Sequence, residues 1–347
     1  MTKNSPDLHK PITLRALAAK LNVHISTVSR VLNGSEEDAR SAAAPETVAL
    51  IRELAAQHNY RPNPYATSLK TKKTRTVGVL VPRLSDLVLA TIYEGIDAAA
   101  TREGYWTVVA NTEDKVERHR QVGEMMLGRH VDGLVFADAR LDDSSFIESI
   151  HERGIPMVLA SRHLGPQYCT VACDDAEGGR LAAAHLLDLG HERVAVLAGE
   201  RFASTGYDRA MGFVEHCRSR GVTVPGSWLL HSQFDTGSGR ELGNRLLSGK
   251  TRPTAVFAVN DFLAIGLMGA ARDQGLQPGK DIAIVGFNDT PLAAELPIPL
   301  TSIKSSMHQM GLTAMELLLE RIAGKSPASV RLRPELVVRA SSGGVLA

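Results

Sequence analysis

Near the N-terminus, the pattern of apolar and polar positions predicts two short helices joined by a tight turn. In the first helix the apolar residues recur at helical spacing, at Leu14, Leu17, Ala18 and Leu21. Thr13 precedes them and is a good N-cap, because its hydroxyl can accept a hydrogen bond from the first helical turn. A connection of four residues at 21–24 leads to the second helix, which ends at Asn33-Gly34.

The second helix is amphipathic in a way that favours DNA binding. One face carries Val28, Val31 and Leu32, and the other carries Ile25, Ser26, Ser29 and Arg30. Two short helices with small polar groups and an arginine facing outward are typical of a helix-turn-helix whose second helix enters the major groove. Any pair of antiparallel helices shares part of this pattern, so the motif needs further support.

A third helix is predicted from about Pro45 to His58, where it closes a three-helix core. The segment Ser35–Ala43 before it is interpreted as a loop, and its acidic residues predict that it points away from a DNA duplex. Pro62 and Pro64 then end the helical head with a bend. The basic stretch 65–73 that follows is too short to form a stable helix alone, and it is suited to ordering against phosphates.

After Arg75 the chain alternates between short apolar runs and helical patterns. The runs that predict strands are Thr76–Val81, Thr107–Ala110, Gly133–Phe136, Met157–Ala160, Val194–Ala198, Trp228–Ser232, Ala255–Val259 and Ile282–Phe287. Helices are predicted at Ile92–Arg102, Arg118–Leu127, Phe146–Arg153, Gly178–Leu189, Tyr207–Arg220, Ser238–Ser248 and Leu263–Gln274. Strands buried on both faces and separated by helices imply doubly wound parallel sheets, and two such series imply two lobes with a cleft between them.

Charge is distributed unevenly along the chain. Residues 1–75 carry a net charge of +6 and the remainder carries −5, although the whole chain is at +1. A basic head on a mildly acidic body is typical of a nucleic-acid-binding module attached to another domain. Cys169, Cys173 and Cys217 lack metal-ligand spacing, and neither an export signal nor an apolar run of membrane-spanning length is apparent. We expect a cytoplasmic protein that contacts no membrane and needs no metal or cofactor.

Polar residues at the carboxyl ends of the predicted strands are the candidates for ligand contact, because open α/β sheets bind ligands there. They are Arg83, Ser85, Asp86, Asp138, Ser161, Arg162, Asp174, Asp175, Arg209, Asn260, Asp261, Asn288 and Asp289. Most such residues merely cap helices. With Arg83, Arg162 and Arg209 all facing the cleft, a sugar acid or a sugar phosphate is one conceivable ligand.

Several stretches resemble the lactose-repressor/galactose-repressor (LacI/GalR) family over nearly the whole chain. They are Thr13-Leu14 through Ala18, the run from Ser26 to Gly34, Tyr60-Arg61-Pro62-Asn63, and Ala66 with Leu69. The resemblance implies an N-terminal helix-turn-helix head (1–60), a hinge helix (61–75) and an effector-binding and dimerisation body (76–347). This body resembles the periplasmic binding proteins, with lobe 1 at about 76–173 and 305–331 and lobe 2 at about 174–304 and 332–341.

The resemblance also implies roles in DNA binding. Residues at positions that face base edges are Ile25, Ser26 and Arg30, and those where family members hold phosphates are Thr13, His24, Thr27, Ser29 and Asn33. Asn63, Ala66 and Leu69 correspond to the hinge that enters the minor groove, where the leucine acts as a wedge. Chemistry agrees, since Arg30 can donate two hydrogen bonds to guanine and Ile25 can pack on a thymine methyl group. His24 stands where a serine usually caps the second helix, which weakens that cap.

In the body, the resemblance favours a sugar-like effector. Arg209 matches an effector-binding arginine, Phe234 matches a stacking aromatic residue, and the turns at Asn260-Asp261 and Asn288-Asp289 match ligand-facing turns. The expected effector site has nine residues, Arg83, Asp138, Ser161, Arg162, Arg209, Phe234, Asn260, Asp261 and Asn288. Residues 86–89 depart from the family pattern after the first strand, so the ligand cannot be transferred from another member. The expected function is repression of carbohydrate-metabolism genes by a homodimer on a palindromic operator in double-stranded DNA.

Other classes of protein fit the sequence less well. Gly243 to Thr251 resembles a phosphate-binding loop, but five residues separate its glycines where four are needed, and a helix precedes it instead of a strand. No nucleophile elbow or zinc helix is present in the sequence, so we expect no enzymatic activity. A transport-type sugar-binding protein would share the two-lobed body but would need an export signal and no DNA-reading head.

Overall fold

The structure is a computed structural model in which residues 12–60 and 73–343 are described. It divides into two compact units, residues 1–74 and residues 75–347, each of which is considered by itself. The predicted hinge residues Asn63, Ala66 and Leu69 lie outside the described residues.

The N-terminal unit contains, among its described residues, the helices α1 (Leu14–Leu21), α2 (Ile25–Asn33), α3 (Glu36–Ala42) and α4 (Pro45–Gln57). Thr13 caps α1 by accepting a hydrogen bond from the Ala16 amide, as its position predicts. Asn22 has a φ of 51°, and this left-handed residue makes the tight turn between α1 and α2 possible. The fully buried side chains at the centre of the unit are Leu17, Val28, Ala39 and Ile51.

The prediction of a loop at Ser35–Ala43 is wrong, because this segment forms helix α3. The Ser35 hydroxyl accepts a hydrogen bond from the Asp38 amide, and the Asp38 carboxylate accepts one from the Ser35 amide. This reciprocal capping box stabilises the start of the helix, and Ala39 then anchors it in the core. The described head therefore has a core of four helices instead of three, and α4 is the helix predicted from Pro45.

The second unit alternates strands and helices throughout. Its strands are β1 (Thr76–Val81), β2 (Trp106–Asn111), β3 (Gly133–Phe136), β4 (Met157–Ala160), β5 (Thr170–Cys173), β6 (Val194–Ala198), β7 (Leu229–His231), β8 (Ala255–Ala258), β9 (Ala283–Asn288), β10 (Thr301–Lys304), β11 (Val330–Leu332) and β12 (Glu335–Val337). Its helices are α6 (Leu87–Arg102), α7 (Val116–Gly128), α8 (Ser145–Glu152), α9 (Asp175–Asp188), α10 (Ser204–Ser219), α11 (Thr236–Leu247), α12 (Asp261–Asp273), α13 (Pro291–Glu295) and α14 (Met307–Ile322).

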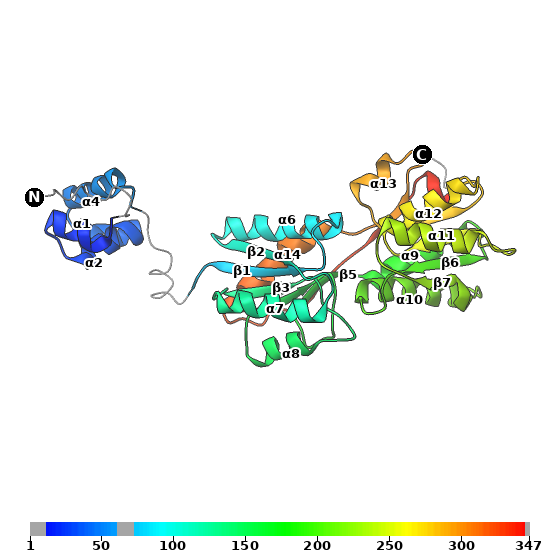
Figure 1. The fold of residues 1–347 in the computed structure, drawn as a ribbon, viewed down its shortest axis with the longest axis horizontal. Helices are drawn as coiled ribbons and strands as arrows, with labels where there is room; N and C mark the ends of the chain where they lie inside the picture. Colours follow the sequence, from blue (N-terminus) through cyan, green and yellow to red (C-terminus); the bar gives the residue numbers. More distant parts are fainter. Residues whose placement is uncertain (1–11, 61–72, 344–347) are drawn as a thin grey trace, which may run out of the picture. The chain divides into compact units, whose positions relative to one another are not determined.

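These strands form two six-stranded sheets, which confirms the predicted α/β class with two doubly wound lobes. Lobe 1 has the strand order β11-β5-β4-β3-β1-β2, and its strands pair in parallel. Lobe 2 has the order β12-β10-β9-β8-β6-β7, in which the β10–β12 pair is antiparallel and the other pairs are parallel. Helices α6 and α14 cover one face of the lobe 1 sheet and α7 and α8 lie on the other (Figure 1).

The chain passes between the lobes three times, after β5, after β10 and between β11 and β12. The first and third passages are tied together, because the Asp174 amide donates a hydrogen bond of 2.9 Å to the carbonyl of Leu332. Strands β5, β10, β11 and β12 were not predicted. Each is three or four residues long, and they border these passages.

Pairs of helices within each lobe approach closely at glycines. A Cβ atom on Gly95 of α6 would lie 2.2 Å from the His308 carbonyl oxygen of α14, and one on Gly311 would lie 2.0 Å from the carbonyl oxygen of Ile92. The same reciprocal arrangement joins α9 to α10 through Gly179 and Gly212, and α11 to α12 through Gly239 and Gly266. The missing side chains let the helix backbones touch, which sets the thickness of the helical layers.

We expect the variant Gly95→Ala to lower the free energy of unfolding of the body by about 1–3 kcal/mol, because the added methyl group overlaps a backbone carbonyl that cannot move alone. Urea unfolding followed by tryptophan fluorescence measures this, since Trp106 and Trp228 both belong to the body. The control is Gly128→Ala at the end of α7, where a Cβ meets no described atom within 4 Å. Equal unfolding midpoints for the two variants would contradict the packing argument.

Candidate functional site

The exposed face of α2 gathers the residues predicted to contact bases. Val28 and Val31 face the core, whereas Ser26 and Arg30 are exposed and Ile25 remains 38% exposed. Ile25 is not among the apolar side chains that pack on the core of the described head. It is suited to contact with a base edge.

The residues predicted to contact phosphate surround this face. Thr13, His24 and Asn33 are exposed or half-buried, as are Thr27 and Ser29, so each can be reached from solvent. His24 caps α2 despite replacing a serine, because its Nδ1 accepts a hydrogen bond of 3.2 Å from the Ser26 amide. Its Nδ1 also lies 2.7 Å from the Ser26 hydroxyl. The turn before α2 is therefore ordered by its own side chains.

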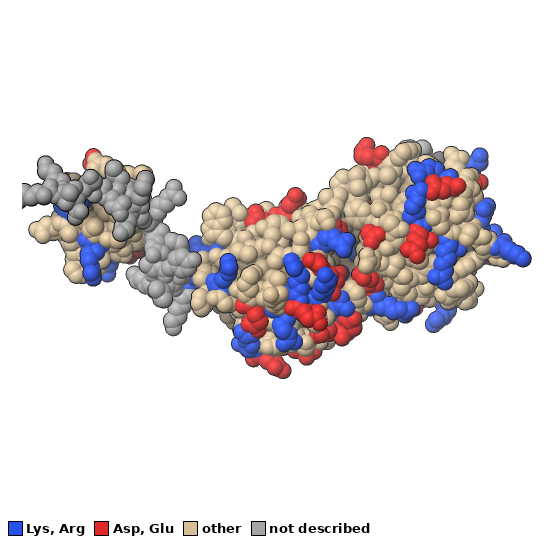
Figure 2. Space-filling view, viewed as in Figure 1, with Lys and Arg blue, Asp and Glu red and all other residues tan. Residues whose placement is uncertain are grey.

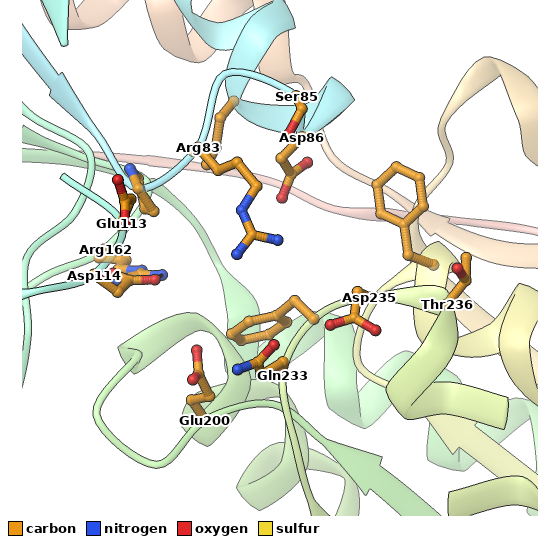
Figure 3. A pocket seen from close by; sticks show the side chains of 14 residues that line it. Arg83, Ser85, Asp86, Glu113, Asp114, Arg162, Glu200, Gln233, Asp235 and Thr236 are labelled. Atoms are coloured by element: carbon orange, nitrogen blue, oxygen red, sulfur yellow. Dashed lines mark hydrogen bonds and ion pairs between the residues drawn. The ribbon is translucent and has the colours of Figure 1, made fainter. Parts of the chain in front are cut away.

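In the body, a cleft of about 330 Å³ is lined from both lobes. Lobe 1 contributes residues from the ends of β1, β2 and β4, and lobe 2 contributes residues from the ends of β6 and β7 and the start of α12. The lining residues are Pro82, Arg83, Ser85, Asp86, Leu89, Glu113, Asp114, Arg162, Glu200, Gln233, Phe234, Asp235, Thr236 and Phe262 (Figure 3). The carboxyl ends of both sheets thus face one site, as expected for open α/β sheets.

A smaller hollow of about 50 Å³ adjoins the cleft. It shares Asp86, Leu89, Arg162 and Phe234 with the cleft and adds Val88, Ser161, Thr205, Arg209, Asn260 and Asn288. The structure therefore brings together seven of the nine residues predicted to bind an effector. They are Arg83, Ser161, Arg162, Arg209, Phe234, Asn260 and Asn288.

Arg209 is held firmly at the base of this hollow. Its Nε donates a hydrogen bond of 2.7 Å to Asp175, and one Nη donates to the carbonyl of Val259 at 2.9 Å. The same nitrogen lies 3.5 Å from Oδ1 of Asn288, and the guanidinium stacks on the ring of Phe287 at 3.7 Å. Burial raises the pKa of Asp175, and the charge and hydrogen bond of Arg209 oppose that rise.

Arg162 is similarly engaged. It donates two hydrogen bonds to the carboxylate of Asp114, at 2.6 and 3.2 Å, in a bidentate pair. Two of the three arginines predicted to bind an anionic ligand are thus already bonded to carboxylates. A sugar acid or sugar phosphate would have to compete with Asp114 and Asp175 for them, and this disfavours an anionic ligand.

The position of the Phe234 ring depends on Gly199. A Cβ on Gly199 would lie 2.0 Å from Cζ of Phe234, so only a glycine leaves room for the outer edge of this ring beside the backbone that follows β6. Asn260 holds the backbone of this residue by donating a hydrogen bond of 3.0 Å to the Phe234 carbonyl. A ring fixed in this way offers one apolar face to a ligand.

Two predicted residues, Asp138 and Asp261, do not line the cleft. Asp138 is enclosed in lobe 1, where its carboxylate lies 2.9 Å from Nδ1 of His119. Burial acts to raise the pKa of Asp138, but His119, Thr112 and Arg162 together outweigh it, and the pKa falls below its usual value. Asp261 accepts hydrogen bonds of 2.6 Å from the Ser302 hydroxyl and 2.7 Å from the Thr290 amide. Both side chains are committed to structural contacts, which a position at a strand end does not reveal.

Several residues that line the cleft were not predicted from the sequence. Glu113 and Asp114 follow β2, Glu200 follows β6, and Gln233, Asp235 and Thr236 follow β7 on either side of the predicted Phe234. The strand-end rule that selected the other candidates applies equally to these positions, since all three strands were predicted. The carboxylates among them make the cleft acidic, whereas the hypothesis of an anionic ligand rested on three arginines alone.

The buried carboxylate of Asp261 predicts a pH-dependent contribution to stability. Burial raises its pKa from 3.8 to about 6, although hydrogen bonds from Ser302 and Thr290 oppose the rise. Because the folded pKa exceeds the unfolded one, the stability from this group is fully present below about pH 4 and is lost as the pH rises through 6. Relative to Asp261→Asn, which does not titrate, we expect the wild-type free energy of unfolding to fall by up to about 3 kcal/mol between these values.

Urea unfolding at several pH values between about 4 and 7 measures this difference. The matched control is Asp188→Asn, an exposed carboxylate that pairs with Arg220 on the surface. It shows what the loss of a carboxylate that is not buried does to the free energy of unfolding at each pH. A wild-type advantage over Asp261→Asn that grows as the pH rises would contradict the raised pKa.

The fold and the cleft define a class of protein, a two-lobed ligand-binding body joined in one chain to a separate helix-turn-helix unit. A family model described as a periplasmic binding protein-like domain matches residues 183–342. A transcriptional repressor named PurR from Pasteurella multocida is 31% identical over 332 residues, which cover 95% of this chain and 98% of the relative. A PurR repressor from Photobacterium profundum is 30% identical, with the same coverage.

Solved structures that are similar to this chain also belong to transcriptional regulators. The lac repressor dimer bound to operator and the anti-inducer ONPF matches with a TM-score of 0.86 and 26% identity, covering 96% of this chain and 99% of that chain. A complex of the transcriptional regulator CelR with cellobiose matches with a TM-score of 0.72 and 29% identity, covering 95% and 100%. The chain belongs to the LacI/GalR family of transcriptional regulators.

The homologues are transcriptional repressors with ligand-binding domains and are not enzymes, so the expectation of no enzymatic activity is confirmed. Across residues 12–60 and 73–343, no helix combines the length and the apolar character needed to cross a membrane.

Proposed function

We propose that this chain represses carbohydrate-metabolism genes by binding a palindromic operator as a homodimer, under the control of a sugar-like effector in the interlobe cleft. The observation that carries the proposal is the cleft itself, which combines hydrogen-bonding groups from both lobes with the apolar rings of Phe234 and Phe262. A sugar presents hydroxyl groups at its edge and an apolar face to a ring. The similar regulator CelR, solved with cellobiose, supports this ligand class.

The proposed roles on DNA follow the geometry of α2. Arg30, Ile25 and Ser26 read bases, while Thr13, His24, Thr27, Ser29 and Asn33 hold phosphates. Asn63, Ala66 and Leu69 would enter the minor groove at the operator centre. We assign residues 1–60 to the head, 61–75 to the hinge and 76–347 to the body, within which the effector would alter the angle between the lobes.

Selection from fragmented genomic DNA tests this proposal. The effector-free full chain is incubated with the fragments at near-physiological salt, and the retained DNA is sequenced. We expect an approximate palindrome upstream of genes for carbohydrate transport or breakdown. Retention without any common sequence would contradict sequence-specific binding, and a palindrome beside unrelated genes would contradict the carbohydrate assignment.

On the recovered operator, Arg30→Ala should weaken binding by about 1–3 kcal/mol and relax the preference at one base pair in each half-site, because a bidentate contact to guanine is lost. Fluorescence anisotropy with single-base variants of the operator measures both effects. Arg52→Ala is the control, since Arg52 lies on α4 in an exposed pair with Glu36 and should change affinity little. An unchanged base preference in Arg30→Ala would refute its assigned role.

The dimer is proposed to form through the edge of lobe 1. Strand β2 is the last strand of its sheet, and it carries Trp106 at 78% exposure and Val108 at 43%. An edge strand with an exposed tryptophan is suited to burial against a second copy. Figure 2 shows that the surface over α6, which packs against β2, has few charged side chains, whereas that over α7 and α8 is densely charged.

Trp106→Asp should therefore shift the protein from dimer to monomer and reduce affinity for the palindromic site, because the buried edge would hold an unpaired charge. Sedimentation velocity measures the oligomeric state. Met125→Asp provides the control, because Met125 is 45% exposed on α7 of the same lobe but lies away from β2. A dimer that persists in Trp106→Asp would place the interface elsewhere.

A further inference from the structure

Two charged side chains in the cleft have no partner among the described residues. Most of its charges are already engaged, since Asp114 binds Arg162, Glu113 binds Lys115, and Asp86 and Asp235 cap helices α6 and α11. The side chains of Arg83 and Glu200, by contrast, form no hydrogen bond or ion pair within the part of the chain that the structure describes. Charged groups in a concave site that make no internal bond are available to a ligand.

These two residues come from opposite lobes. Arg83 follows β1 in lobe 1, and Glu200 follows β6 in lobe 2. Figure 3 shows the guanidinium of Arg83 and the carboxylate of Glu200 both directed into the cavity, from opposite sides. A ligand that contacts both would bridge the lobes.

The surrounding charge decides what kind of ligand fits. Five carboxylates and two arginines line the cleft, and the Asp114–Arg162 pair cancels one charge of each sign. Burial raises the pKa of Glu200, and the neighbouring charge of Asp114 raises it further, while Arg162, Arg140 and Arg83 oppose the rise. Burial also raises the pKa of Asp86. The carboxylates that line the cleft outnumber its arginines, so an anionic ligand would add negative charge to a site that already carries it.

A hydroxyl group suits the same surroundings. It can accept a hydrogen bond from Arg83 and donate one to Glu200, whereas an ionised phosphate or carboxylate has no proton to donate and would be repelled by Glu200. The rings of Phe234 and Phe262 provide the apolar contact that the carbon face of such a ligand needs.

We propose that Arg83 and Glu200 determine the effector class, forming a donor and acceptor pair across the cleft that selects an uncharged polyhydroxylated ligand and rejects anionic ones. This inference rests on the proposed function, because it concerns the ligand of the same cleft. It adds Glu200 as a specificity-determining residue. The excess of carboxylates in the cleft would then weaken the binding of phosphorylated and oxidised sugars, which are anionic.

Matched sugars test the charge preference on the full-length protein by calorimetry. The sets are glucose with glucose 6-phosphate and gluconate, ribose with ribose 5-phosphate, and cellobiose with cellobionate, each at up to about 10 mM. In every set that binds, we expect the neutral sugar to bind at least about tenfold more tightly than its anionic forms. An anionic form that binds more tightly than its parent overturns the inference, and so does an absence of binding in all three sets.

The variant Glu200→Gln removes the charge but keeps the size and the ability to hydrogen-bond. We expect it to raise the association constant of the phosphorylated sugar relative to its parent by at least about tenfold. Glu215→Gln is the control, a glutamate on α10 of the same lobe that lies outside the cleft, and it should leave the ratio unchanged. Thermal unfolding of both variants confirms that the body is folded. An unchanged ratio in a folded Glu200→Gln protein overturns the role of Glu200.

Operator binding, measured in parallel by fluorescence anisotropy, distinguishes a failure of the charge preference from a failure of the proposed regulatory function. If a sugar phosphate binds and releases the operator, effector control stands and the charge preference fails. If neutral sugars bind but the operator is neither bound nor released, the charge preference stands and the regulatory function fails.

Discussion

The close packing of helix α9 against helix α10 fixes the position of the Arg209 side chain at the base of the cleft. A Cβ on Gly179 would lie 2.0 Å from the carbonyl oxygen of Arg209, so only a glycine lets the two backbones meet there. Asp175 lies one helical turn before Gly179 on the same face of α9, and it receives the Arg209 side chain at 2.7 Å. Breaking a buried pair of this kind costs about 3–5 kcal/mol, so this contact holds Arg209 in place while the rest of the site is built around it.

The Arg209 contact also connects the cleft to the passages between the lobes. Asp175 directly follows the first passage, and Asn288, which lies 3.5 Å from Arg209, donates a hydrogen bond of 3.0 Å to Ser305 on the second. A ligand that bonds to Arg209 or Asn288 would therefore contact groups that are linked to the segments connecting the two lobes. This continuity of hydrogen bonds is a physical basis for a change in lobe angle upon binding.

Sequence patterns located most of the fold because its central strands are buried on both faces and appear as uninterrupted apolar runs. Strands β1, β3, β4 and β6 agree with the predicted ranges residue for residue. The pattern failed at Ser35–Ala43, where a short polar helix depends on its capping box and on Ala39, and at the short strands near the passages. In the site, the rule that polar residues at strand ends face a ligand located the side chains but did not show which of them bond to one another. Arg162 and Asp114 are 48 residues apart, and no local sequence pattern shows that their charges neutralise each other.

The free energy needed for the proposed change in lobe angle can be supplied by a small number of ligand contacts. To change the ratio of two conformations from 1:99 to 99:1, a ligand must bind one conformation about 5.5 kcal/mol more tightly than the other. A hydrogen bond to a charged group contributes about 1.5–3 kcal/mol. A ligand that bonds to Arg83 and Glu200 only when the lobes are near each other would gain about 3–6 kcal/mol, so one pair of groups facing each other across the cleft supplies most of the difference. If the effector changes the affinity for operator DNA as proposed, operator DNA changes the affinity for the effector by the same factor, because coupling between two binding sites is reciprocal.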